Sequence, residues 1–204
     1  KPFGFDLESA TDFLERSGRY FKEEQIYRID HYMGKEVTQY LLELRSNADN
    51  HHHGWDFNTV KSIDVVASEK IGIESRGVFY EQTGALRDFI QGHLLQLLCL
   101  VLMEINDEPL SERRLRVLEQ LEPADPARAR RAQYEGYENE VDNVGSLTET
   151  FASVELESSQ ERWHGVPLRL ITGKNLDEKR SYVEVTYRDG SIDTFEEGKT
   201  PVSG

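Results

Sequence analysis

The sequence predicts an α+β fold in which helices pack on a mainly antiparallel β-sheet, and three observations favour this class. Segments with helical spacing of apolar residues gather in the earlier part of the chain, whereas short alternating segments gather late. The two kinds of segment do not alternate as they would in a parallel α/β sheet. Finally, Asp189-Gly190 stands between two short β-like runs, which is typical of a hairpin between antiparallel strands.

Four helices are predicted where apolar residues recur every three to four positions. The first follows Asp6, whose carboxylate can accept hydrogen bonds from free N–H groups of the first turn. The third is the longest and the most apolar, so we expect it to be central. The four predicted helices are 6–21, 37–45, 83–104 and 111–121.

Strands are predicted where Val, Ile and aromatic residues alternate with polar ones. A short β-like run over 25–29 leads into a charged motif, and polar connections are expected over 46–58 and 123–143. The predicted strands of the sheet are 59–68, 148–157, 168–172, 182–187 and 192–195.

Composition excludes several function classes. The 204 residues include 24 Lys or Arg and 38 Asp or Glu, and the net charge of −14 would repel nucleic acid. The single cysteine, Cys99, excludes an internal disulfide and fits a reducing compartment. It lies in an apolar run too short to span a bilayer, where a buried, inert thiol is expected. No basic leader precedes a cleavable apolar segment. We therefore expect a cytoplasmic protein with neither nucleic acid nor a membrane as partner.

The stretch from Arg28 to Glu36 carries the most chemistry of any segment. It contains Asp30, His31, Tyr32 and Lys35. If a helix begins near His31, then His31 and Lys35 lie four apart on one face and can converge on a single anion. Taken alone, these nine residues slightly favour a solvated helix start with ordinary capping and ion pairs.

Four blocks together change that interpretation. The charged motif resembles the substrate-binding signature of glucose-6-phosphate dehydrogenase, and 76–98 resembles that family's segment with the catalytic histidine. Lys1-Pro2-Phe3-Gly4 resembles the junction between its coenzyme and substrate domains. A fourth family motif is similar to 162–167 followed by 172–174, and all four blocks stand in the family's order.

The resemblance implies roles for individual residues. His93 matches the proton acceptor of the family, and Asp30 matches the carboxylate that orients it; histidine titrates near neutral pH, as such a base requires. Without the resemblance, His93 would be interpreted as a core histidine and Asp30 as a helix cap. Lys1 matches a lysine between sugar and nicotinamide. The implied substrate-binding residues are His31, Tyr32, Lys35, Glu69, Asp88, Lys174 and Lys179.

The resemblance also implies a domain organisation and a reaction. Residues 1–189 would be the substrate domain, truncated, of an enzyme that oxidises glucose 6-phosphate with NADP, and 190–204 a short divergent tail. No Gly-rich dinucleotide fingerprint follows a predicted strand, so we expect the coenzyme domain to be absent and NADP to be inherited from the family. The family's sheet supplies a dimer interface, which makes a homodimer an expectation here.

Two other classes stay open. A chain that keeps the site without a coenzyme domain would be a non-catalytic module that binds sugar phosphates or a partner. The run His51-His52-His53 suggests a metal, but consecutive residues do not share a helical face, and no spaced cysteines or carboxylates accompany them. We therefore expect a solvated loop and no metal site.

Overall fold

The computed structural model describes residues 4, 6–27, 29–46, 55–199 and 202–203. The chain divides into two compact units, Lys1–Asp30 and His31–Gly204. This division lies near the charged motif, whereas the sequence predicts a boundary between 189 and 190. The two units are described separately below.

The first unit contains one helix, α1 (Leu7–Gly18), followed by the 3₁₀-helix η1 (Glu23–Gln25). The predicted cap is confirmed, because the Ser9 N–H donates to the Asp6 carboxylate at 2.8 Å. The β-like run predicted over 25–29 forms no strand among its described residues. No residue of α1 is buried, and Leu7, on the apolar stripe that predicted this helix, is 84% exposed.

The second unit is built on a seven-stranded sheet with the order β2-β3-β4-β1-β5-β6-β7. Only β1 and β4 pair in parallel, so the prediction of a mainly antiparallel sheet is confirmed. The strands are β1 Val60–Ser68, β2 Arg130–Ala132, β3 Phe151–Leu156, β4 Leu168–Gly173, β5 Arg180–Tyr187, β6 Ile192–Glu196 and β7 Val202–Ser203. The five predicted strands correspond to β1, β3, β4, β5 and β6; β2 and β7 are additional.

The tail predicted from residue 190 begins inside this sheet. The Asp189-Gly190 hairpin is confirmed: Gly190 has φ +95°, and β5 pairs antiparallel with β6. The strand β6 then pairs with β7. Residues after 189 therefore extend the same sheet.

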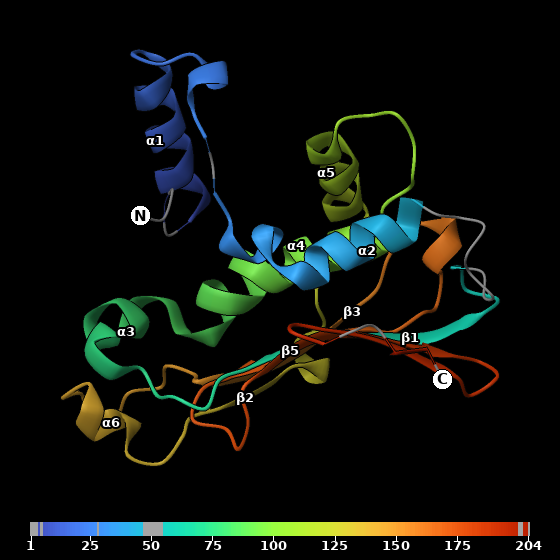
Figure 1. Ribbon diagram of the computed structural model, residues 1–204. Helices are drawn as coiled ribbons and strands as arrows, with labels where there is room; N and C mark the ends of the chain where they lie inside the picture. Colours follow the sequence, from blue (N-terminus) through green and yellow to red (C-terminus); the bar gives the residue numbers. More distant parts are fainter. Residues whose placement is uncertain (1–3, 5, 28, 47–54, 200–201, 204) are drawn as a thin grey trace. The chain divides into compact units, whose positions relative to one another are not determined.

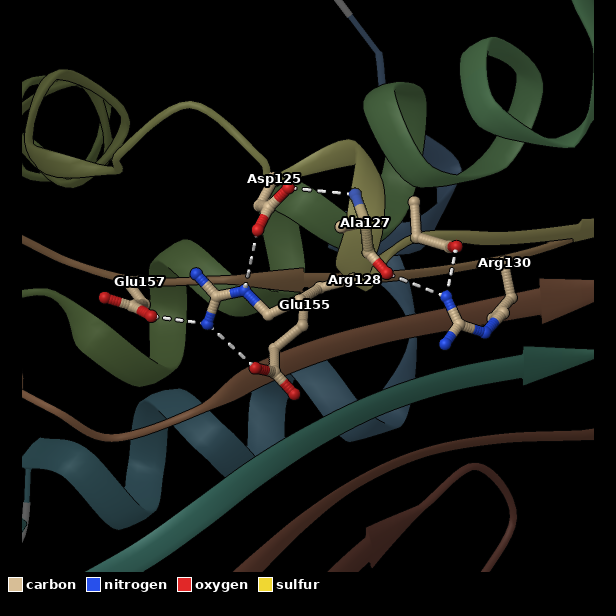
Figure 2. Close-up of polar contacts among 7 residues, drawn as sticks. Asp125, Ala127, Arg128, Arg130, Glu155 and Glu157 are labelled. Carbon is tan, nitrogen blue, oxygen red and sulfur yellow. Dashed lines mark hydrogen bonds and ion pairs between the residues drawn. The ribbon is translucent and has the colours of Figure 1, made fainter.

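The connection predicted over 123–143 is structured. It contains the 3₁₀-helix η6 (Pro126–Arg128), the edge strand β2 and the short helix α6 (Tyr137–Glu140). Figure 2 shows Arg128 reaching β3: its guanidinium donates to Glu155 at 3.0 Å and to Glu157, and it pairs with Asp125. The strand β2 pairs with β3, which is distant in sequence, so local polarity gave no sign of a strand here.

The helices of the second unit follow the predicted positions with one large difference. The predicted helix 83–104 begins earlier and has three parts, which are α3, a π-helix (η5) and α4. The elements are η2 His31–Gly34, α2 Glu36–Ser46, η4 Glu74–Arg76, α3 Gly77–Ala85, η5 Leu86–Leu94, α4 Leu95–Leu102, α5 Leu110–Gln120 and η7 Glu161–Trp163.

The core lies between the sheet and helices α2 and α4, which cross one face of it (Figure 1). Ile63, Val65 and Ala67 alternate toward this core from β1, and Trp163 donates its indole N–H to the Leu102 carbonyl at 3.0 Å. Cys99 is buried, and burial raises the pKa of its thiol to about 12, as expected for an inert cysteine.

One stretch of the described residues, Glu74–Leu102, has the length and apolar composition of a membrane span. Half of its most apolar window is buried inside the protein, and α4 packs against the core of the sheet. This is the setting of a central core helix, which is how the sequence is interpreted above.

Candidate functional site

The charged motif folds as a tight turn followed by a helix. His31–Gly34 forms η2, and α2 begins only at Glu36, so the spacing of His31 and Lys35 does not place them on one α-helical face. The Thr38 hydroxyl fixes the turn by donating to the Tyr32 carbonyl at 2.7 Å. The Lys35 ammonium then lies 3.9 Å from the centre of the Tyr32 ring, a cation–π contact.

The His93 ring is packed among aromatic rings from two segments far apart in sequence. It stacks on Tyr32 with 4.7 Å between centroids and lies edge-on to His31 at 4.5 Å. On its own helix, Phe89 contacts it at 5.5 Å. The ring of the predicted base is thus held by aromatic contacts against His31 and Tyr32, two of the residues predicted to bind the substrate.

The π-helix determines which side chains accompany His93. Asp88 precedes it by five positions. In an α-helix of about 3.6 residues per turn, side chains five positions apart would point roughly 140° away from each other. The i→i+5 bonding of a π-helix puts more residues in each turn, so Asp88 and His93 point closer to the same side than they would in an α-helix. One carboxylate oxygen of Asp88, Oδ2, is buried and has no hydrogen-bond partner among the described residues.

The π-helix begins at a kink that only glycine can adopt without strain. Gly84 has φ +61° and ψ −179°, and an added Cβ would lie 2.5 Å from the Glu149 carboxylate. Glu149 accepts from the Leu86 N–H at 3.0 Å through its side chain and from the Ala85 N–H at 2.9 Å through its carbonyl. Glu149 therefore caps the start of the segment that carries Asp88 and His93.

Lys174 is a buried cation at the end of β4. It is 3% exposed, pairs with Glu69, and lies 5.4 Å from the Tyr80 ring centre and 5.8 Å from that of Phe89. The backbone supports this pair, since the Glu69 N–H donates to the Gly173 carbonyl at 2.9 Å. Burial, followed by the charge of Asp88, raises the pKa of Tyr80, so this phenol stays neutral. A buried ion pair of this kind is costly unless it is well satisfied, which makes it a candidate ligand site.

Lys35 stands among several charges. Burial lowers the pKa of its ammonium, Glu197 acts in the opposite direction, Lys179 lowers the pKa further and Glu69 raises it. Lys179 itself is exposed. The residues predicted to bind phosphate therefore share one electrostatic environment.

The structure does not connect three of the predicted residues or segments to the site around His93. Asp30 is the last residue of the first unit, so its role as partner of His93 stays a prediction. Lys1 lies outside the described residues, and so does the run His51-His52-His53.

Four contributing residues were not predicted from the sequence. Phe89 stands four positions before His93, a helical spacing that could have identified it. The kink at Gly84 brings Tyr80 to the site, and the register of the strands brings Ser181 and Glu197 there. The sequence offers no local signal for either feature. The Ser181 hydroxyl lies 3.2 Å from the Tyr32 hydroxyl.

Comparison with known protein families gives a match for each of two consecutive parts of the chain. Residues 42–203 match the family model described as "Glucose-6-phosphate dehydrogenase, C-terminal domain". Residues 1–40 match the model described as "Glucose-6-phosphate dehydrogenase, NAD binding domain". The charged motif thus stands near the junction of the two family domains.

Individual relatives of the chain belong to the same family as the matching models. The chain is 36% identical to glucose-6-phosphate 1-dehydrogenase of Rhizobium meliloti (strain 1021), covering 100% of this chain and 45% of the relative. It is 39% identical to cytoplasmic glucose-6-phosphate 1-dehydrogenase 6 of Arabidopsis thaliana, covering 96% of this chain and 39% of the relative. The chain therefore spans less than half the length of these curated relatives.

Solved structures agree as well. A glucose-6-phosphate dehydrogenase in complex with its substrate glucose-6-phosphate is 32% identical, with a TM-score of 0.89 over 96% of this chain and 45% of that one. Glucose-6-phosphate 1-dehydrogenase from Mycobacterium avium is 33% identical, with a TM-score of 0.90 over 100% of this chain and 50% of that one.

Proposed function

Because the chain belongs to the glucose-6-phosphate dehydrogenase family, we propose that it supplies the substrate site of an enzyme that oxidises glucose 6-phosphate to 6-phosphogluconolactone with NADP. The observation that carries this proposal is the contact of His93 with Tyr32 at 4.7 Å and with His31 at 4.5 Å. A candidate base and candidate phosphate ligands, remote in sequence, meet in one place.

The proposed chemistry begins with proton removal at C1 of the sugar. His93 accepts the proton of the C1 hydroxyl while hydride leaves C1, so the carbon–oxygen bond becomes the carbonyl of the lactone. Asp30 orients His93 and stabilises the imidazolium that forms. The nicotinamide, when bound, supplies the hydride acceptor.

The substrate is held at two ends in this proposal. His31, Lys35 and Lys179 bind the phosphate by charge-assisted hydrogen bonds, with the Tyr32 hydroxyl as a further donor. Asp88, whose Oδ2 is buried and lacks a partner among the described residues, accepts from a sugar hydroxyl. Glu69 and Lys174 act on the sugar as a neutralised pair. These contacts fix the distance between the phosphate and C1, which places C1 at His93.

The described residues contain no Gly-rich turn between a strand and a helix that would cradle a pyrophosphate. Lys1, proposed to lie between sugar and nicotinamide, is outside them.

Two further features belong to the same proposal. A cytoplasmic location is supported by the names of plant relatives. A homodimer, with the sheet at its interface, belongs to the proposal because the resemblance to the family implies it. Light scattering at several protein concentrations would detect the dimer, and a mass of one chain throughout would exclude it.

A second candidate is a sugar-phosphate-binding module without catalysis, favoured by the absence of a coenzyme fingerprint in the described residues. The two candidates differ in the role of His93. In the active enzyme, His93→Asn should lower kcat by about 10²–10⁴-fold with little change in substrate affinity. The exposed His164 provides a matched control, since His164→Asn should leave kcat unchanged. Equal kcat in all three proteins, or no NADP reduction in any, would contradict the catalytic proposal.

A further inference from the structure

The phosphate-binding end of the proposed site consists of His31, Tyr32, Lys35 and Lys179. Glu197 is connected to it through Ser181 of strand β5. It directly follows β6, and its backbone N–H donates to the Ser181 carbonyl at 3.0 Å. The side chain of the same Ser181 contacts the Tyr32 hydroxyl at 3.2 Å, and the Tyr32 ring carries the Lys35 ammonium at 3.9 Å. Glu197 therefore belongs to the cluster that surrounds Lys35.

One carboxylate oxygen of Glu197, Oε2, is buried and has no hydrogen-bond partner among the described residues. Among the same described residues, no carboxylate oxygen lies within 4.0 Å of the Lys35 ammonium, so Lys35 forms no ion pair there. Even so, Glu197 is the negative group that acts most strongly on Lys35. A buried acceptor of this kind gains free energy from any ligand that brings a donor.

The carboxylate next to Glu197 in sequence, by contrast, already has partners. Glu196 accepts two hydrogen bonds from Arg180 and pairs with Lys199, so its charge is already neutralised. On the side of η2 and α2 stand His31, Tyr32 and Lys35, and on the side of β1 and β5 stand Glu69, Lys179 and Arg180. Glu197 is the member of this group with a buried, unpartnered oxygen, among the residues described.

We propose that Glu197 is a specificity-determining residue of the phosphate-binding end, which shares one proton with the bound phosphate monoester. The proposal rests on the proposed function, because it assumes that a sugar phosphate binds at Lys35. A phosphate monoester that carries one proton offers a P–O–H group to Oε2. The dianion offers no donor and places like charges together, so it binds only with uptake of a proton.

This arrangement couples binding to pH. The second pKa of a phosphate monoester is about 6, so the ligand is mainly dianionic at pH 8. Wild-type binding at pH 8 therefore takes up a proton, and the apparent affinity falls as the pH rises from 6 to 8. In Glu197→Gln the carboxamide donates to the dianion directly, so no proton is required at this position.

Calorimetric titration of this chain with glucose 6-phosphate tests the proposal. Titrations at pH 6 and pH 8, in two buffers of different ionisation enthalpy, report both the affinity and the number of protons taken up. We expect Glu197→Gln to bind roughly threefold to tenfold more tightly than wild type at pH 8 and to take up fewer protons. His31 contributes equally to both proteins, so their difference isolates Glu197. The surface variant Glu119→Gln is the control and should match wild type.

The outcomes separate two failures. Glu197→Gln with the affinity and proton uptake of wild type at both pH values would overturn the role of Glu197 and leave the proposed function intact. A folded wild-type chain and variant that both fail to bind glucose 6-phosphate would overturn the proposed function, and the role of Glu197 with it. Glucose 6-sulfate, which is singly charged and has no ester OH, should bind Glu197→Gln better than wild type.

Discussion

At the scale of single residues, Lys35 gives the phosphate-binding end its own pH dependence. Burial lowers the pKa of its ammonium, so the charge is lost at a lower pH than in an exposed lysine. Affinity for glucose 6-phosphate should therefore weaken as the pH rises through this lowered pKa. Lys35→Arg keeps a charge that cannot be removed in this range and should retain binding. Parallel alkaline profiles for the two proteins, measured by titration from pH 7 to 10, would contradict this account.

Asp88 should lower the stability of the folded protein and strengthen the binding of glucose 6-phosphate. Its buried Oδ2 has no partner among the described residues, so the folded state carries a desolvation cost that a ligand hydroxyl would relieve. We expect Asp88→Leu to raise the free energy of unfolding by about 1 kcal/mol and to weaken binding of glucose 6-phosphate at least tenfold. Urea unfolding and calorimetry measure the two quantities. A variant that loses stability and keeps binding would show that Asp88 has a structural role.

At the scale of elements, the kink at Gly84 positions the π-helix with Asp88 and His93. Gly84→Ala forces an alanine into a glycine-only conformation and against the Glu149 carboxylate. We expect a loss of about 1–3 kcal/mol in urea unfolding, together with weaker binding of the substrate.

The control lies in the same stretch. Gly92 is exposed, and an added Cβ would meet only the Arg87 carbonyl at 3.6 Å. Gly92→Ala should therefore leave stability unchanged or raise it by roughly 0.5–1 kcal/mol. Equal losses in the two variants would mean that the kink is not the strained point.

At the scale of the whole molecule, the two units should differ in local stability. No residue of α1 is buried, whereas every residue of α4 from Leu97 to Leu102 is. Amide hydrogens of α1 should exchange close to the rates of an open chain, and those of α4 only through global unfolding. Hydrogen exchange read by mass spectrometry checks this, and equal protection of the two helices would refute it.

Sequence reasoning succeeded where the signal is local. The Asp6 cap, the strand β1 and the Asp189-Gly190 hairpin each depend on neighbouring residues, and each is confirmed. The motifs also brought His31, Tyr32 and His93 into one site, although their individual roles remain proposals. The π-helix, the strand β2 and the position of Glu197 depend on distant partners such as Glu149 and Ser181. No window of the sequence shows such contacts, because they exist only once the sheet has formed.

The central claim is that residues 31–197 build a site for a sugar phosphate. Its most direct test is calorimetric titration of this chain with glucose 6-phosphate, beside His31→Ala/Lys35→Ala and with glucose as control ligand. The account predicts binding by the wild-type chain, a loss of roughly 2–5 kcal/mol in the double variant, and no signal with glucose. Equal binding of glucose 6-phosphate by the wild-type chain and the double variant, or no binding by a folded wild-type chain, would contradict it.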